Sequence, residues 1–485
     1  MPAALLIDFG STYTKLRAID LAQAGITASA QGPSTVTTDV NVGLDAALAD
    51  LERKLGGLPR FKYRLASSSA AGGLRMVTIG LVRELTAEAA RQAALGAGAK
   101  VVGTFAYRLT AADDQRIAEL APDIVLLAGG TDGGNSDVIR HNAMRLALSG
   151  LFCPIVVAGN RDVGQDLAAL LAGHGKMAVL SENVMPNFGE LNIDPAREAI
   201  RQVFIDRIVH AKGIDRAAAR FDAVLMPTPA AVMEGARLLA DGPPGRSGLG
   251  DLVVIDIGGA TTDVHSVSLG TPSREGVIQH GLPEPRVKRT VEGDLGMRHN
   301  ARTIVEAIGL DTICARSGLA ADIIHGLLEK IVADVEHLPQ SADEAMLDEA
   351  LAWAAVRLAV SRHVGSLKIV HTVQGPVMVQ TGKDLTTVTT VIGTGGPLAH
   401  GGDPGQRPAG SRCGRPGCRL PAARGAATAR GSRLPALRSR PSRRSRARTR
   451  LQSRHAIVAA RRQRGKPWLP SPNCVKPSPH CPRPG

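Results

Sequence analysis

The chain has 485 residues, which is enough for two or three domains and a large core. Its net charge of +14 is concentrated at one end, because residues 401–485 contain 21 of the 58 Lys and Arg residues but a single acidic residue, Asp403. The other 37 basic and 43 acidic residues give residues 1–400 a net charge of −6. The basic overall charge therefore says little about what this body binds, and no run of 18 apolar residues predicts a membrane-spanning helix.

The N-terminal segment MPAALLIDFG has no basic residues before its apolar run, and Asp8 interrupts that run. We therefore expect no signal peptide, no membrane partner and a cytoplasmic location. Cys153 and Cys314 are the cysteines that precede residue 400, which is typical of a reducing compartment without a disulfide framework.

The first predicted elements are strands at 3–9 and 13–20, a helix at 41–55, and a strand, Gly/Ser turn and strand over 63–81. From residue 82 the pattern alternates, with helices at 86–97, 110–121, 135–148 and 161–173 and strands at 100–105, 123–129, 153–159 and 176–180. We expect Thr86 to cap the first of these helices. Alternation with short loops predicts a parallel, doubly wound α/β module, inserted at 82–215 and closed by a helix at 195–213.

Residues 224–242 predict a strand that runs into a helix, with Thr228 as its N-cap, Pro229 in the first position and Gly242 at its end. A strand hairpin follows at 252–268. The remaining predicted elements are helices at 299–310, 319–337 and 343–362 and strands at 368–373 and 387–398.

Residues 401–485 are rich in Arg, Ser, Pro and Gly and show no periodicity. Such a tail buries too little apolar surface to offset the entropy cost of ordering, so we predict that it is disordered. Its charge favours nucleic acid electrostatically, but Trp468 is its one aromatic residue and offers no stacking platform. We therefore do not expect a nucleic-acid partner.

Two related phrases, IDFGSTYTK at 7–15 and IDIGGATTD at 255–263, each end a β-branched strand in Asp-x-Gly and enter a hydroxyl-rich turn. Glycine lets backbone N–H groups approach phosphate closely, hydroxyls donate to phosphate oxygens, and lysine neutralises their charge. The candidate phosphate-binding residues are Gly10, Ser11, Thr12 and Lys15 in the first phrase and Gly258, Gly259, Thr261 and Thr262 in the second.

Three aspartates in these phrases are candidate catalytic residues. Asp8 and Asp256 end their strands and are the candidate metal ligands, because Mg²⁺ binds through one or two carboxylates while keeping several waters. Asp263 is placed to orient the metal or an attacking water. Two such hairpins facing each other would clamp one ATP triphosphate from both sides, which would explain why the Asp-x-Gly hairpin occurs twice. Taken alone, each hairpin also fits a tight turn with hydroxyl caps.

The order IDFGSTYTK, TPAAVMEGA, IDIGGATTD, VIGTGGPL resembles the phosphate 1, connecting, phosphate 2 and adenosine motifs of the actin, sugar kinase and heat-shock-70 ATPase superfamily. The resemblance implies a duplicated actin-like (ribonuclease H-like) ATPase fold of the α/β class, with halves at 1–81 and 216–400 around the insert. It also implies that Gly393, Gly395 and Gly396 line the adenosine and that Gly235 allows close packing of the connecting helix.

Residues 1–400 more narrowly resemble the MutL-type accessory proteins of glutamate mutase (methylaspartate mutase), which are unrelated to the mismatch-repair protein of that name. The stretches that carry this resemblance are LLIDFGSTYTK, LLAGGTDGGN, ENVMPNFGELNIDPAR, MPTPAAVMEG, DIGGATTDVHSV and RTVEGDLGMRHNA. The resemblance implies a reactivating, chaperone-like protein that uses ATP and Mg²⁺, with ATPase activity and with subunits of the adenosylcobalamin-dependent mutase as partners. The mutase chemistry would lie on those subunits. The alternative is a small-molecule kinase on the same fold, which needs a further aspartate facing a substrate hydroxyl.

The phrase AGGTDGGN at 128–135 lies between a predicted strand and a predicted helix of the insert. One interpretation is a connecting loop that needs glycine for positive φ. The other is a ligand loop in an insert that mimics or grips a flavodoxin-like cobalamin subunit.

The chain departs from the family pattern just after VIGTGGPLAH. The resemblance predicts a second connecting helix there, packed across from 226–240, but the sequence becomes Arg/Pro/Gly/Ser/Ala-rich. We interpret this as a frameshift near codons 398–403 that leaves the second half incomplete; a genuine basic tail is the alternative.

Overall fold

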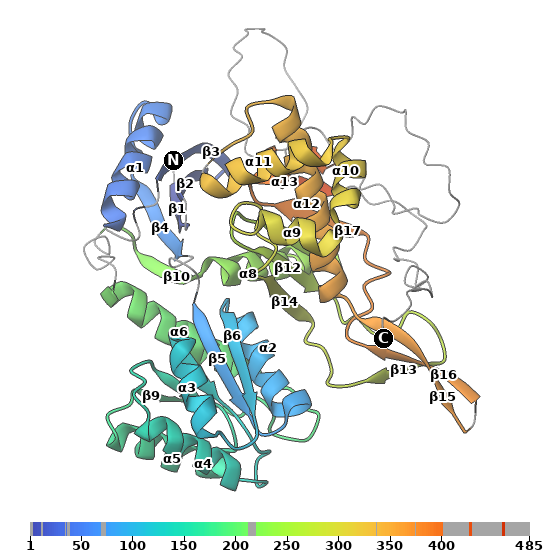
Figure 1. Cartoon of the computed structure of the whole chain (residues 1–485). Helices are drawn as coiled ribbons and strands as arrows, with labels where there is room; N and C mark the ends of the chain where they lie inside the picture. Colours follow the sequence, from blue (N-terminus) through green and yellow to red (C-terminus); the bar gives the residue numbers. More distant parts are fainter. Residues whose placement is uncertain are drawn as a thin grey trace.

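The computed structural model describes residues 3–10, 13–33, 35, 39–68, 74–211, 220–335, 337–373 and 375–400, and two short strands in the tail. Figure 1 shows two halves, each built around its own sheet, with the insert packed beside them. No helix in these ranges is long and apolar enough to cross a bilayer.

The first half is a mixed sheet of five strands in the order β10-β4-β1-β2-β3. Its strands are β1 (Ala3–Phe9), β2 (Tyr13–Asp20), β3 (Gly25–Pro33), β4 (Phe61–Ser68) and β10 (Ala223–Pro227). The first three form an antiparallel meander, and β4 and β10 add in parallel. Helix α1 (Val40–Leu55) begins at Asp39, whose carboxylate accepts from Asn41 N–H, and ends at Gly56 in the left-handed region.

The second half repeats this topology. Strands β11 (Leu252–Ile257), β12 (Thr262–Val267) and β14 (Val287–Glu292) form the meander, and β17 (Thr390–Thr394) pairs in parallel with β11. The repeated meander with a parallel strand on the same side of its first strand confirms the predicted duplicated actin-like fold.

Alternate residues of β11 face the two sides of the second sheet, as the two-residue period of a strand requires. Val253 and Ile255 pack with four helices, α9 (Ala301–Ile308), α10 (Leu310–Ser317), α11 (Ala321–Ala333) and α12 (Ala342–His363). Val254 packs on the other side with Ala236 and Ala240 of α8 (Thr228–Asp241). Helix α8 follows β10 of the first half, so it joins the two halves.

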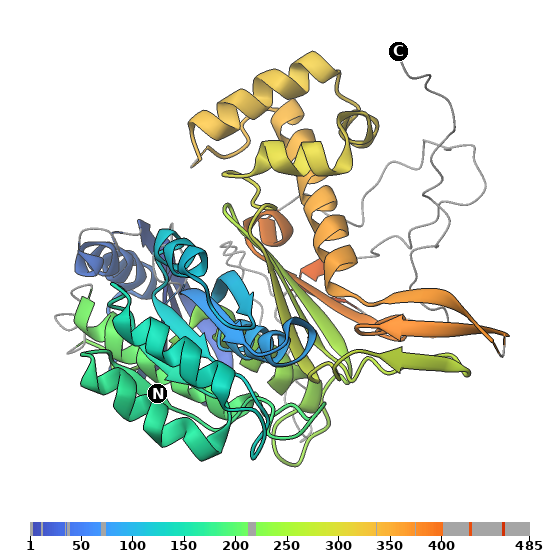
Figure 2. The same cartoon turned by 60° about the horizontal axis from the view of Figure 1, so that its bottom comes forward.

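A small sheet projects from the second half (Figure 2). It is formed by β13 (Val277–His280), β15 (Ser366–Thr372) and β16 (Gly375–Thr381). Helix α13 (Gly396–His400) follows β17. From the tail, β19 (Val458–Ala460) pairs with β17 and with β18 (Ala426–Thr428). The rest of 401–485 lies outside the described residues, so its disorder stays a prediction.

The insert is the parallel, doubly wound module that the alternation predicts. Its strands are β5 (Arg75–Gly80), β6 (Lys100–Ala106), β7 (Ile124–Leu127), β8 (Ile155–Val157) and β9 (Ala178–Leu180), in the order β6-β5-β7-β8-β9. Its helices are α2 (Glu88–Gly96), α3 (Ala111–Glu119), α4 (Asp137–Leu148), α5 (Arg161–Gly173) and α6 (Asp194–Ala211). Because β5 belongs to this sheet, the insert begins before residue 82, the expected boundary.

Thr86 and Thr228 were predicted as helix N-caps, and neither is one in the structure. A π-helical turn, η1 (Arg83–Ala87), precedes α2, and Thr86 lies inside it with its hydroxyl accepting from the N–H groups of Leu81 and Val82. Thr228 is the first residue of α8, Pro227 is the N-cap, and the Thr228 hydroxyl bonds to a distant carboxylate instead. Gly242 ends α8 as predicted.

The close packing expected at Gly235 is not seen among the described residues. A Cβ at Gly235 would meet no atom within 4 Å among the described residues. The second connecting helix, which the family pattern places on this surface, is not among the described elements.

Candidate nucleotide-binding site

The first hairpin places Asp8 near the end of β1, directly across from Lys15 on β2. The Gly10 N–H donates to the Tyr13 carbonyl at 3.1 Å and tightens the turn. A Cβ at Gly10 would lie 2.6 Å from the Tyr13 oxygen, so this turn requires glycine. Ser11 and Thr12, the predicted hydroxyl donors, lie outside the described residues.

The second hairpin has the same geometry, with Asp256 directly across from Asp263. The Gly258 N–H donates to the Thr261 carbonyl at 2.9 Å, as the glycine of the first hairpin does. The two hairpins therefore superpose in register, and Asp263 occupies the position that Lys15 has in the first.

A loop from the second half supports this turn from behind. The N–H groups of Met297 and Arg298 donate to the carbonyls of Gly258 and Gly259, at 3.1 and 2.9 Å. Thr262 is buried and its hydroxyl donates to the Leu295 carbonyl at 2.7 Å. The hydroxyl of Thr262 is therefore committed to building the turn, which leaves the half-buried Thr261 as the phosphate-donor candidate of the pair.

Two hydroxyls hold the Asp8 carboxylate. Thr228 Oγ1 donates to Asp8 Oδ1 at 2.7 Å, and Ser67 Oγ donates to the same oxygen at 3.2 Å. They come from the start of α8 and the end of β4, so three elements of the first half converge on this carboxylate. Neither hydroxyl was among the residues predicted from the sequence.

The pKa of Asp256 is raised to about 6, mainly by burial and next by the charge of Asp263, with a smaller contribution from Asp8; Lys15 and Arg289 act in the opposite direction. Charge effects fall with distance, so the Asp8 and Lys15 side chains of one hairpin lie near Asp256 of the other. Residues of the two hairpins are therefore within electrostatic range of one another.

The charges at this site fit a divalent cation coordinated with phosphate. A buried carboxylate with a raised pKa is stabilised in its ionised form when a cation binds beside it. Within the described ranges no group of three His, Cys, Asp or Glu side chains gathers as a metal cage. Two aspartates with water and phosphate oxygens suit Mg²⁺, which is held by few protein ligands.

Asp263 is engaged by a partner that the sequence did not reveal. Arg289 Nη2 lies 3.1 Å from Asp263 Oδ1, and both side chains are buried. Burial raises the pKa of the Asp263 carboxyl, and Arg289 acts in the opposite direction. The catalytic role of Asp263 stays a prediction, but its charge is already balanced within the protein.

The predicted adenosine glycines follow the strand that pairs with the second hairpin. Gly393 on β17 lies beside Ile255 of β11. Gly395 has φ +89°, and a Cβ there would lie 2.1 Å from the Ile257 carbonyl oxygen, so the position excludes any side chain. Gly396 starts α13 and is exposed, and no atom of the described residues lies within 4 Å of the position its Cβ would take.

The AGGTDGGN loop of the insert has the conformation expected of a connecting loop that needs glycine for positive φ. Gly129, Gly130 and Gly133 all have positive φ, and a Cβ on Gly130 would lie 2.1 Å from the Asn135 oxygen. Asn183 Nδ2 donates to the carbonyl of Gly130 and to Asp132. The strand order of this module is that of flavodoxin-like folds, but the loop's glycines are explained by its own turns.

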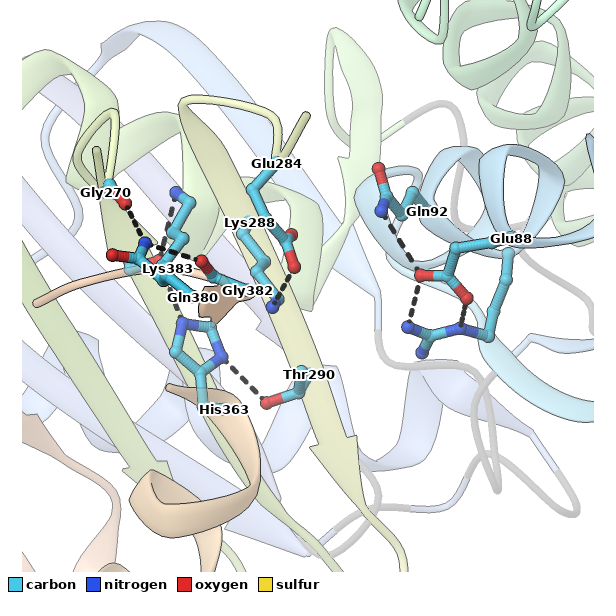
Figure 3. Close-up of polar contacts among 12 residues, drawn as sticks. Glu88, Gln92, Gly270, Glu284, Lys288, Thr290, His363, Gln380, Gly382 and Lys383 are labelled. Carbon is cyan, nitrogen blue, oxygen red and sulfur yellow. Dashed lines mark hydrogen bonds and ion pairs between the residues drawn. The ribbon is translucent and has the colours of Figure 1, made fainter. Parts of the chain in front are cut away.

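A buried polar network borders the second hairpin on the side of the projecting sheet (Figure 3). His363 contacts Thr290 Oγ1 at 2.9 Å and Ser266 Oγ at 2.8 Å. Lys383 Nζ donates to the carbonyls of Ser268 and Arg286, and burial lowers its pKa to about 7. These groups are satisfied by one another and fix the base of the projecting sheet.

Comparison with known proteins identifies the family. A sequence model of the family described as MutL protein matches residues 4–425. The chain belongs to the MutL protein family. "Protein MutL" of Clostridium tetanomorphum is 47% identical over 407 residues, which cover 84% of this chain and 88% of that protein.

Solved structures show only slight likeness to this MutL-family chain. Xylulose kinase from Bifidobacterium adolescentis is 12% identical, with a TM-score of 0.21 and coverage of 81% of this chain and 89% of that one. The activator of 2-hydroxyisocaproyl-CoA dehydratase from Clostridium difficile, with bound ADPNP, is 13% identical, with a TM-score of 0.12 and coverage of 37% and 89%. At these scores, nothing about ligands transfers from either structure.

Proposed function

We propose that this MutL-family chain is an ATP-binding accessory protein that reactivates the adenosylcobalamin-dependent glutamate (methylaspartate) mutase in the cytoplasm. The observation that supports the nucleotide part is the matching geometry of the two Asp-x-Gly hairpins, whose strand registers and turn hydrogen bonds correspond. The charges of Asp8 and Lys15 in the first hairpin also act on the pKa of Asp256 in the second. The mutase part rests on membership of the MutL family.

In this proposal Asp8 and Asp256 hold a hydrated Mg²⁺, and Lys15, with the turn residues of both hairpins, binds the β- and γ-phosphates. The exposed Gly396, next to the tight turn at Gly395, leaves space for the adenosine beside the second hairpin. ATP binding then draws the two halves together, and hydrolysis or exchange releases them.

The kinase alternative is disfavoured by the charges of the site. A kinase needs an aspartate free to face a substrate hydroxyl. Asp8 accepts from two hydroxyls and Asp263 is paired with Arg289, which leaves Asp256, the residue proposed for the metal.

Two measurements on the whole chain test the proposal. Calorimetric titration with Mg-ATP is expected to show binding that Asp256→Ala abolishes. ATP turnover is then expected to rise on addition of the mutase carrying inactivated cobalamin. Turnover that rises instead with a small metabolite alone would favour the kinase, and absence of ATP binding would reject both functions.

A further inference from the structure

The turn at the end of α2 lies where the insert meets the second half. Arg289 Nη1 donates to the carbonyls of Leu95 and Ala99, at 3.3 and 3.0 Å. The same guanidinium holds Asp263 of the second hairpin through Nη2. One side chain therefore connects the second hairpin to the C-terminal end of the insert's first helix.

The same turn touches the first half. Gly98 has φ +90°, and a Cβ there would lie 3.0 Å from Pro227 Cβ and 3.2 Å from Ala230 N. These residues flank Thr228, whose hydroxyl holds Asp8 of the first hairpin. The turn at 95–99 is thus contacted from both sides by the residues that position the aspartates of the two hairpins.

The link through Arg289 is buried. The Arg289 side chain is 3% exposed and that of Asp263 is 12% exposed, so water cannot replace a hydrogen bond that lengthens. The carbonyls at a helix C-terminus carry partial negative charge, which adds to the attraction of the guanidinium. A shift of Asp263 must therefore move Arg289, and with it the end of α2.

Helix α2 also lies beside β14, the strand that carries Arg289. Figure 3 shows Glu88 and Gln92 on the helix and Lys288 and Thr290 on the strand. Glu88 bonds to Arg91 and Gln92 on the helix itself. Among the described residues the hydrogen bonds of Glu88 stay within α2, and the charge of Arg91 acts on Glu284 and Glu292 of the second half without a hydrogen bond to them. Arg289 provides the hydrogen-bonded link to the hairpin.

We propose that the turn at residues 95–99 transmits nucleotide binding to the insert, with Arg289 as the positioning residue of the link. The inference rests on the proposed function, because the nucleotide supplies the change at the two hairpins. It assigns the insert the role of the responding module, whose first helix moves when the hairpins close on Mg-ATP.

Hydrogen–deuterium exchange of the full chain with and without saturating Mg-ATP tests the link, after calorimetry has established binding. Exchange over residues 88–99 is expected to slow at least two-fold in the unaltered protein. Arg289→Lys keeps a charge beside Asp263 but cannot reach both carbonyls, and Gly98→Ala separates the turn from α8. Gly98→Ala is expected to bind Mg-ATP as the parent does and to lose the exchange response. Arg289→Lys, which also contacts Asp263, is expected to lose the response when compared at Mg-ATP concentrations that saturate it.

Arg91→Lys is the matched control, because Arg91 lies on the same helix and bonds to Glu88; its response should be retained. If one test variant fails to fold, the other decides, since they act on opposite sides of the turn. Mg-ATP binding without slower exchange in the unaltered protein overturns the inference, as does a response that persists in a folded test variant. Absence of ATP binding in the first step would overturn the proposed function, and the link with it.

Discussion

Thr228 and Asp8 are 220 positions apart in the chain, yet Thr228 Oγ1 lies 2.7 Å from Asp8 Oδ1. The contact ties the first residue of α8 to the carboxylate proposed to hold the metal. Helix α8 packs on the second sheet, so this hydrogen bond places the first hairpin relative to the second half.

We expect Thr228→Val to weaken Mg-ATP binding about 10-fold, because a hydrogen bond to a charged group contributes roughly 1.5–3 kcal/mol. Calorimetric titration measures the change. Thr228→Ser keeps the hydroxyl and is expected to bind nearly as well as the parent. Equal affinities for all three proteins would show that this contact does not position the metal ligand.

Asp256→Asn is expected to stabilise the nucleotide-free protein while abolishing Mg-ATP binding. The folded-state pKa of about 6 is above the ordinary Asp value, so the folded state holds an extra proton between pH 4 and 6. Stability therefore falls as pH rises through this window, and at pH 7 the ionised group destabilises the fold. Removing the charge should raise the free energy of unfolding by ~1–2 kcal/mol at pH 7.

Urea titrations at pH 7 with and without Mg-ATP measure both effects. Asp322→Asn, on the exposed start of α11, is the matched control and should change neither quantity appreciably. A destabilised, nucleotide-binding Asp256→Asn protein would contradict the assigned role.

His265→Leu is expected to make the protein less sensitive to acid. His265 is buried and its pKa is lowered to about 3 by burial and by Arg289. Because the unfolded chain binds a proton at His265 below pH 6.5 and the folded protein does not, stability falls as pH falls from 6.5 toward 3. The slope from this residue is about 1.4 kcal/mol per pH unit.

Urea midpoints between pH 7 and 4.5 measure that slope, which the leucine variant should lack. His371→Leu, on exposed β15, serves as control and should leave the slope unchanged. A slope that is the same in parent and His265→Leu would mean that the imidazole titrates normally in the fold.

A chimera tests the frameshift interpretation. We expect replacement of residues 399–485 by the corresponding C-terminal segment of the Clostridium tetanomorphum relative to raise the melting temperature by about 2–5 °C. The reason is that Leu238, Leu239 and Leu249 on and after α8 are 53%, 43% and 50% exposed, on a surface that a second connecting helix would cover. Thermal melts of the parent and the chimera measure the two melting temperatures. An unchanged or lower melting temperature in the chimera would favour a genuine basic tail.

Sequence periodicity predicted the regular elements well where one physical signal dominates. The hairpin strands at 3–9 and 13–20 and the helix at 161–173 match the structure residue for residue. Strand β3 was missed because the alternating residues of GITASAQGP are mostly small and give a weak apolar signal. Strand β14 was missed because VKRTVE buries charged and polar side chains among partners from elsewhere. Helix α10 was missed because the chain turns at Gly309 between two short helices.

The sequence predicted the turns of the candidate site better than the contacts of its aspartates. Both Asp-x-Gly phrases form the tight hairpin turns that were predicted, and their phosphate-binding role stays a prediction. The partners of the aspartates, Ser67, Thr228 and Arg289, come from distant elements. Thr228 lies in the TPAAV motif and Arg289 opens RTVEGDLG, but nothing local shows which carboxylate each meets.

The position of α8 in the chain also means that its apolar face is buried late during synthesis. Its Ala236 and Ala240 emerge from the ribosome long before Ile392, the last strand residue of the cluster that buries them. Until residue 392 has been translated, a nascent chain whose first sheet has folded still exposes the apolar face of α8 to solvent. Successful biogenesis of this protein therefore depends on protecting an intermediate of about 240 residues for the time needed to translate 150 more.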